Sequence, residues 1–187
     1  MTDYSVADYV SDIRAIVGEE TDPRRITERI RPLATRLAAA PGWITDEHRA
    51  CDEAQGFGVH LLHEEDNHDL AVFLISWLPD RGTLPHNHAT WAVVAGIEGQ
   101  EQEVEWVRRD DGSKPGYAEL ERAGERVMTA GGSSACLPDD IHSVWNVGDE
   151  ISLSLHTYGR HINHTGRSEF DPEARAERPF VVKVEDG

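Results

Sequence analysis

The sequence predicts a mainly β protein, with an antiparallel double sheet or jelly roll that follows a helical N-terminal segment. The first observation is that apolar residues after Gly56 fall in short runs separated by Gly-rich and Asp-rich turns. The second is that no repeated helices alternate with these runs, which argues against a parallel α/β sheet. The 187 residues show no internal repeat and no domain boundary, so a single domain is the simplest organisation.

The N-terminal segment predicts two helices. Apolar residues recur at helical spacing over residues 3–17, with Asp3 or Ser5 near the start. Asp22, which a proline follows, opens a second helix that continues to about residue 40. Pro32 lies inside this second stretch and is expected to kink or split it. We expect both helices to pack against the outside of the β structure.

The remainder predicts short strands joined by turns. Glu101, Glu103 and Glu105 alternate along one of the strands, which predicts a single acidic, solvated face. A further edge strand is a candidate over residues 180–184. The clearest strands are expected over residues 57–62, 70–77, 91–97, 100–107, 144–146 and 151–158, with turns at 110–112 and 130–132.

Composition narrows the possible partners. A formal net charge of -17 argues against nucleic-acid binding, which needs clustered Lys and Arg, and against anionic lipid. No apolar run approaches the ~20 residues of a membrane span, and the N-terminus carries no secretion signal pattern. Two cysteines, Cys51 and Cys136, are too few for a disulfide framework. These features predict a cytoplasmic protein with neither nucleic acid nor membrane as a partner.

Three histidines predict a metal site. His86 and His88 are two positions apart, so in an extended strand both imidazoles leave the same face, with Cα atoms roughly 6.6 Å apart. His142 belongs to a later apolar strand and can supply a third ligand once the sheet folds back on itself. Imidazole is the commonest protein ligand for first-row transition metals.

The alternative is a chance pair, because the chain has ten histidines. The context favours the metal. A Gly-Thr-Leu-Pro turn leads into the pair, an apolar stretch after it ends at Gly99, and a turn at Pro138 introduces His142.

Together these segments resemble the two motifs of the cupins. The pattern is a Gly-led turn with His-x-His, followed by a Pro turn whose His142 precedes Asn146. Within that fold the chain is similar to the thiol dioxygenases, specifically the bacterial branch of the cysteine dioxygenase family that includes 3-mercaptopropionate dioxygenase. A third matching element is the stretch Ser154-Leu155-His156-Thr157-Tyr158. The resemblance covers roughly residues 56–167.

The resemblance implies a cupin double-stranded β-helix, a jelly-roll barrel, as one domain over residues 1–187. A helical segment over 1–50 would pack outside a barrel core over 56–158, and an extension over 159–187 would follow. It also implies one mononuclear Fe(II) per chain, bound by the three histidines. Cupins usually have a Glu ligand four or five residues after the second histidine, and those positions here are Ala92 and Val93. That difference favours a neutral three-histidine set over the facial triad of two histidines and one carboxylate.

The row of Ser154, His156 and Tyr158 alternates along its strand, so the three side chains share one face. By resemblance, Tyr158 reaches toward ligands of the metal, and His156 and Ser154 support it through hydrogen bonds. The alternative for this row is a structural network in the core. A neutral ligand set suits an anionic thiolate, and the implied reaction adds both atoms of O2 to sulfur to give a sulfinate.

The substrate is inferred from two differences. In cysteine dioxygenases of the mammalian type, a cysteine at the position of Val93 is cross-linked to the active-site tyrosine, and valine cannot form this link. Those enzymes also have a carboxylate-binding arginine in the strand before the motif, and around that place this chain has His60 and His63. Arg167 instead resembles the carboxylate-binding arginine of 3-mercaptopropionate dioxygenases, since a guanidinium matches a carboxylate with two hydrogen bonds. Arg160 competes for this role, and Arg167 could also be a surface residue of a loop.

The first expectation is therefore an iron enzyme that acts on a small thiol carboxylate and O2, with 3-mercaptopropionate as the first choice. The alternatives are cysteine dioxygenase proper, a cupin isomerase or hydrolase with Zn, Ni or Mn, and a non-catalytic small-molecule-binding cupin. Histidines alone do not select Fe over Ni, Cu or Zn, by the Irving–Williams order. The oligomeric state is left open, with a monomer or weak homo-oligomer expected.

Overall fold

The computed structural model describes residues 4–185 and begins with two helices, α1 (Val6–Glu19) and α2 (Pro23–Ala38). The side chain of Ser5 accepts a hydrogen bond from the backbone N–H of Asp8, whose carboxylate accepts one from the N–H of Ser5. This reciprocal arrangement is a capping box. The Asp3 alternative for the start of this helix lies outside the described residues.

Helix α2 runs through Pro32 without a break, so the expectation of a split helix is wrong. Asp22 caps its start, and proline occupies the first position, where no N–H is needed. Pro32 lies on the exposed face, so the helical carbonyl that it leaves without a partner can bond to water. The opposite face, which includes Ile30 and Leu37, is fully buried and stabilises the helix.

Ten strands follow within residues 4–185, and a short 3-10 helix, η1 (Asp46–Arg49), precedes them. A second one, η2 (Ile162–His164), follows β8. The strands are β1 (Phe57–Glu64), β2 (Asp69–Trp77), β3 (Ala92–Glu98), β4 (Gln100–Arg108), β5 (Leu120–Thr129), β6 (Ser133–Cys136), β7 (Ile141–Asn146), β8 (Ser152–Arg160), β9 (Ser168–Asp171) and β10 (Ala176–Pro179). The turns expected at residues 110–112 and 130–132 are confirmed.

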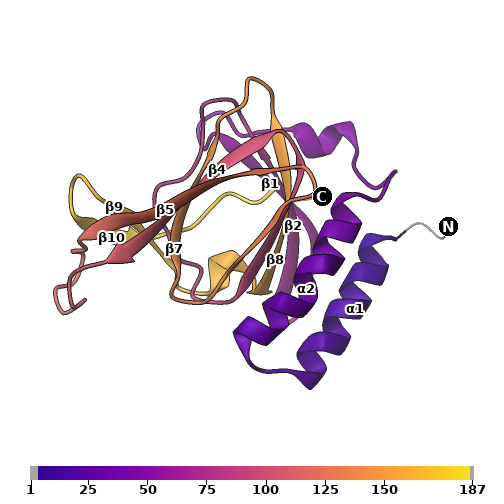
Figure 1. The fold of residues 1–187 in the computed structure, drawn as a ribbon, viewed down its shortest axis with the longest axis horizontal. Coiled ribbons are helices and arrows are strands. Elements are labelled where there is room, and N and C mark those ends of the chain that lie inside the picture. Colours follow the sequence, from indigo (N-terminus) through magenta and orange to yellow (C-terminus); the bar gives the residue numbers. More distant parts are fainter. Residues whose placement is uncertain (1–3, 186–187) are drawn as a thin grey trace.

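Eight of these strands form two antiparallel sheets that face one another, and β9 and β10 form a separate two-stranded sheet (Figure 1). One sheet has the order β1-β2-β8-β3-β6, and the other has the order β5-β4-β7. The chain passes from one sheet to the other and back, so neighbours in a sheet are distant in sequence. This confirms the mainly β, double-stranded β-helix architecture that the sequence predicts, with the helices outside it.

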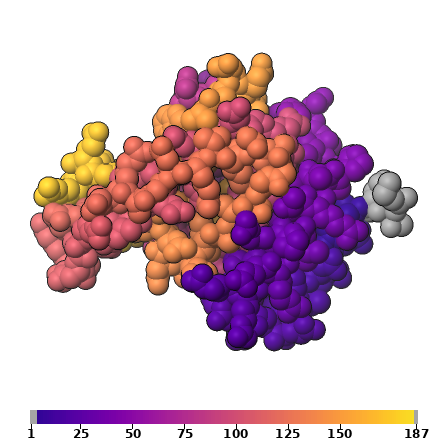
Figure 2. Space-filling view, viewed as in Figure 1, coloured from indigo at the N-terminus to yellow at the C-terminus, as the bar shows by residue number. Residues whose placement is uncertain are grey.

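The helices cover the outer face of the five-stranded sheet. Their apolar sides pack against Val72, Val93, Ala95 and Leu155, which point away from the barrel interior. Figure 2 shows the helical layer as one flank of the molecule, on the side opposite the yellow atoms of the β9–β10 region. The alternate residues of the same strands point inward. The inward set includes Phe57, Val59, Phe73, Ile75, Trp77 and Tyr158.

Two predictions for the strands are wrong. The acidic residues of β4 do not share a solvated face, because Glu101 and Glu103 are 3% and 4% exposed inside the barrel. A change of register between Glu105 and Trp106 accompanies the change of environment, and Glu105 is exposed. Residues 180–184 form no strand, because only Glu185 makes an isolated bridge, to His60.

The chain after β8 closes one side of the barrel. Strands β9 and β10 form a hairpin at the end of the molecule away from the helices (Figure 1). The segment that follows packs Phe180 and Val182 against the inward-facing residues of the barrel. None of the helices within residues 4–185 has the length and apolar character that a membrane crossing requires.

Candidate metal centre

The segment that carries the His-x-His pair is held against β7 by backbone hydrogen bonds. The N–H of His86 donates to the carbonyl of His142 over 2.8 Å, and the N–H of His142 donates back over 3.0 Å. Thr83 makes a similar bond to the Val144 carbonyl. Gly82 must be glycine, because a Cβ there would lie 2.1 Å from the carbonyl oxygen of Val144. The Gly-led turn therefore places His86 directly opposite His142.

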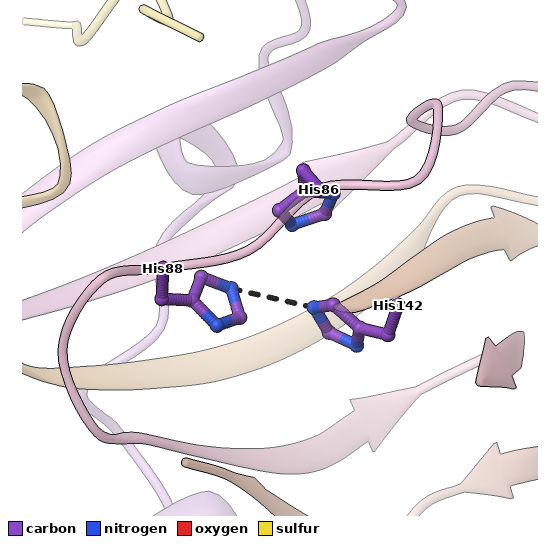
Figure 3. Close-up of side chains that lie close together, drawn as sticks. All are labelled: His86, His88 and His142. Carbon is purple, nitrogen blue, oxygen red and sulfur yellow. Dashed lines mark hydrogen bonds between the residues drawn. The ribbon is translucent and has the colours of Figure 1, made fainter. Parts of the chain in front are cut away.

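The structure brings together all three histidines (Figure 3). Their side chains are at most 5% exposed, and the ring centroids are 4.7 to 5.1 Å apart. Burial is the largest cause that lowers the pKa values of His86 and His88, and the positive charge of His142 lowers them further. Both rings are therefore neutral at physiological pH, as metal ligands must be.

The donor atoms fit a metal ion. The Nδ1 atom of His86 donates to the Leu84 carbonyl over 3.0 Å, and that of His142 donates to Glu103 over 2.9 Å. These bonds leave Nε2 as the ligand atom in both rings. Burial lowers the pKa of His142, but Cys136 and Glu103 raise it, to about 10, so this ring must lose its Nε2 proton when a metal ion binds. The Nε2 atoms of His88 and His142 are 3.3 Å apart. Two nitrogens on one ion at bond lengths of about 2.1 Å would be roughly 3.0–3.4 Å apart. The three residues therefore fit a mononuclear metal ion.

Glu103 is a buried residue of the centre, although its alternation in the sequence predicted a position in solvent. Its carboxylate accepts from His142 and from Arg126, whose Nη2 atom is 2.8 Å away. Burial raises the pKa of Glu103, but the hydrogen bond from His142 and the positive charges of His142 and Arg126 outweigh this effect. The pKa is therefore lowered, to about 2. The residue is therefore ionised and orients His142. The alternation in β4 was the only signal for it, and alternation does not say which face is inside.

The row on β8 is a continuous hydrogen-bonded chain. Ser154 Oγ and His156 Nε2 are 2.9 Å apart, and His156 Nδ1 and the Tyr158 hydroxyl are also 2.9 Å apart. Trp77 donates its indole N–H to Ser154 over 3.1 Å. Burial lowers the pKa of His156 to about 3, and burial also raises that of Tyr158. Both side chains are neutral, and the Tyr158 ring lies 5.2 Å from that of His88.

The two candidate arginines are in different environments. Arg160 lies at the surface and forms an ion pair with Asp69 over 3.2 Å. Arg167 is 3% exposed, its guanidinium carbon is 4.1 Å from the ring centre of Phe180, and its Nη2 atom has no hydrogen-bond partner. Burial lowers the pKa of Arg167 to about 10, which leaves the group charged at neutral pH. No carboxylate forms an ion pair with this buried cation within residues 4–185.

Arg167 and the centre line the same internal cavity of about 20 Å³, which is close to the size of one water molecule. Phe180 and Val182, from the segment after β10, also line it. A larger hollow of about 420 Å³ lies behind His142, on the side of Glu103, Arg126 and Cys136. All three histidines line the small cavity, whereas His142 is the only one of them that lines the larger hollow, so the small cavity is the reacting side. His60 and His63 do not line it.

Comparisons with known proteins find structural likenesses at low sequence identity. No protein-family model matches the chain. A Klebsiella pneumoniae protein with a double-stranded β-helix domain is 15% identical at a TM-score of 0.49, over 70% of this chain and 97% of that one. KdgF from Halomonas sp. is 13% identical at a TM-score of 0.46, over 63% and 92%.

A recombinant oxalate oxidase in complex with glycolate is 18% identical at a TM-score of 0.43, over 57% of this chain. The matched region spans about half of that enzyme's length, 52% of its chain. At these identities and TM-scores the likenesses do not extend to function. The sequence and geometry describe a candidate mononuclear metal centre of three imidazoles inside a double-stranded β-helix.

Proposed function

We propose that the protein is a non-heme Fe(II) thiol dioxygenase that converts 3-mercaptopropionate and O2 to the corresponding sulfinate. The reaction adds both oxygen atoms to sulfur, RSH + O2 giving RSO2H, so it needs no external reductant. The observation that supports this best is the pairing of a neutral ligand set with an unpaired buried cation, Arg167, in the same cavity.

Charge balance favours a substrate with two anionic groups. Once a ferrous ion has displaced the Nε2 proton of His142, three neutral imidazoles leave the two positive charges of the ion uncompensated, and Arg167 adds a third. A thiolate at the metal and a carboxylate at Arg167 would neutralise both positions. The residues that line the cavity include no carboxylate that could hold the ammonium group of cysteine. This favours 3-mercaptopropionate over cysteine.

Each side chain then has a distinct task. Fe(II), when bound, would supply the position at which the thiol becomes a thiolate and the electrons that activate O2. Arg167 binds the carboxylate and so orients the carbon chain. Tyr158 presents its hydroxyl to the cavity, while His156 and Ser154 hold that hydroxyl in place. Phe180 and Val182 add apolar surface to the cavity lining.

The test is a panel of thiols on the chain reconstituted anaerobically with Fe(II). We expect O2 uptake matched by sulfinate, fastest with 3-mercaptopropionate, slower with cysteine, and slowest with cysteamine, which has no carboxylate. If none of these thiols, nor mercaptosuccinate, is turned over, the proposed activity is wrong.

A variant of Arg167 tests the substrate class. Arg167→Leu removes the charged hydrogen-bond partner of the carboxylate, so KM for 3-mercaptopropionate should rise roughly 10- to 100-fold. KM for cysteamine should change little. Arg160→Leu is the matched control, because that side chain is paired with Asp69 at the surface. Equal effects of both variants on 3-mercaptopropionate would contradict the assignment of Arg167.

A further inference from the structure

A buried cysteine beside the candidate metal centre has no place in the scheme above. Cys136 is the last residue of β6 and is 3% exposed. Its Sγ atom is 3.7 Å from Nδ1 of His142 and 4.0 Å from Oε1 of Glu103, and these last two atoms are 2.9 Å apart. Three donor atoms from β6, β7 and β4 therefore gather at Nδ1 of His142, whereas Nε2 of the same ring belongs to the three-histidine centre.

The spacing of these three atoms is close to that of ligands on one tetrahedral ion. Zn2+ binds a thiolate at about 2.3 Å and an imidazole nitrogen or carboxylate oxygen at about 2.0–2.2 Å, so its ligand atoms are roughly 3.3–3.6 Å apart. The observed distances, from 2.9 to 4.0 Å, bracket this range. A thiol is a weak hydrogen-bond donor, and both contacts of Sγ are long, so hydrogen bonding ties the sulfur only weakly to its neighbours.

Glu103 can bind an ion without losing its ion pair with Arg126. The Nη2 atom of Arg126 is 2.8 Å from Oε2 of the carboxylate, whereas Oε1 is the atom that faces Cys136 and His142. All three donor residues line the hollow of about 420 Å³. A water molecule occupies about 30 Å³, so the hollow has room for water as a fourth ligand.

The charge of the hollow favours a cation. Four carboxyl groups and two guanidinium groups line it, from Glu103, Glu105, Asp139, Asp140, Arg108 and Arg126. This excess of acidic groups, in a chain with a formal net charge of -17, attracts cations and repels anionic ligands. Among cations, a sulfur ligand selects softer ions such as Zn2+ over Mg2+ or Ca2+, which prefer oxygen ligands.

We propose that Cys136, Glu103 and Nδ1 of His142 form a second metal site, for a thiophilic divalent cation of the Zn2+ class. Binding displaces the proton of the Cys136 thiol and the Nδ1 proton of His142, and both protons pass to solvent. Fe(II) precedes Zn2+ in the Irving–Williams order, so it binds this site more weakly than Zn2+ does. A neutral imidazole has a single acceptor nitrogen, so the second site and the three-histidine centre compete for the His142 ring.

The test uses Co2+, a spectroscopic substitute for Zn2+, in the full-length His88→Ala chain under anaerobic conditions. This variant removes a ligand of the competing centre and leaves all three ligands of the second site in place. A thiolate bound to Co2+ gives a charge-transfer band in the near ultraviolet, which imidazole and carboxylate ligands do not give. We expect this band to grow to saturation as Co2+ is added, and to disappear when Zn2+ displaces the Co2+.

The two cysteines of the chain provide a matched pair of variants. In the His88→Ala background, Cys136→Ser should abolish the band and Cys51→Ser should retain it. X-ray absorption of the Zn2+-loaded His88→Ala chain needs no change at Cys136, and we expect one sulfur atom at about 2.3 Å from zinc.

The second site is ruled out if His88→Ala shows no thiolate band, if the band survives Cys136→Ser or is lost in Cys51→Ser, or if zinc has only nitrogen and oxygen neighbours. These measurements need no turnover, so their result is independent of the proposed dioxygenase activity.

Discussion

At the residue scale, the chemistry of the centre depends on two carboxyl groups that are two positions apart on β4. Glu103 has Arg126 and His142 as partners and is ionised, whereas Glu101 has no positive neighbour and is neutral at pH 7. The same side chain therefore has opposite protonation states on one face of one strand. Environment, and not residue type, determines this difference.

Glu103 is expected to control the affinity for the metal. Glu103→Gln keeps the shape but removes the charge that accepts from Nδ1 of His142 and pairs with Arg126. Because such partners orient the ligand and raise its basicity, affinity should fall about 10- to 100-fold. Competition with a chromophoric chelator measures this, and Glu105→Gln should leave the affinity unchanged. An unaltered affinity in Glu103→Gln would mean that the carboxylate does not orient His142.

Glu101 is expected to make stability depend on pH. Its pKa is about 8 in the folded chain, against the ordinary value of 4.5 that applies once the chain unfolds, so the folded state binds more protons between these values. The free energy of unfolding should therefore fall as pH rises from about 4.5 to about 8. Glu101→Gln should lack this contribution and be more stable than the wild type at pH 9. Urea unfolding at pH 5 and pH 9 measures the difference, which should be near zero at pH 5 if only this ionisation matters.

At the element scale, the two helices and the metal centre lie on opposite faces of the same strands. Strand β8 directs Leu155 and Thr157 to the helices and His156 and Tyr158 to the barrel. The hydroxyls of Tyr9 and Thr157 share a buried hydrogen bond of 2.7 Å across the helical interface. The helical layer therefore stabilises the sheet from outside without supplying any residue that lines the cavity.

Removal of a helix core residue should destabilise the fold and spare the centre. Leu37→Ala truncates a fully buried side chain of α2 and should lower the free energy of unfolding by about 2–5 kcal/mol. Leu33→Ala, at a partly buried position of the same helix, should cost less. Denaturant titration measures the loss, and chelator competition checks metal affinity. A drop in affinity in the folded Leu37→Ala variant would show that the helices shape the centre.

The sequence predicted elements well where local period and burial agree. Almost all residues of strands β2, β3 and β8 are buried, and the positions of these strands were predicted closely. Strand β5 was missed, because most of its residues are exposed and its apolar residues do not alternate regularly. Its backbone pairing with β4 holds it in place. The orientation of the acidic face of β4 was wrong, because it depends on which sheet closes over it. That information is not local.

In the candidate site, too, local sequence pattern could be predicted and tertiary arrangement could not. His86, His88 and the Ser154–His156–Tyr158 row could be predicted because residues two apart in an extended segment share a face. The contribution of Glu103 could not, since it becomes visible only when β4 lies beside β7. The proximity of Phe180 to Arg167 likewise depends on how the C-terminal segment folds back over the barrel.

At the scale of the whole molecule, the centre joins segments that are far apart in the chain. His88 and His142 are separated by 54 positions, and both come together only after the two sheets have packed. An unfolded chain therefore offers no preformed three-histidine site. A metal ion that binds the folded state alone must stabilise it by mass action.

We expect chelation of the metal to lower the thermal stability of the chain. At a free metal concentration 100 times Kd, binding contributes about 2.7 kcal/mol. For a chain of this size, that corresponds to a change in Tm of roughly 5–10 °C. Differential scanning calorimetry with and without chelator measures it. His88→Ala should abolish the metal-dependent shift, because only two imidazoles are left at the centre. His164→Ala, which removes an exposed histidine next to His68 and Glu64, should retain it. A shift that survived in His88→Ala and disappeared in His164→Ala would place the stabilising ion at the surface cluster and not inside the barrel.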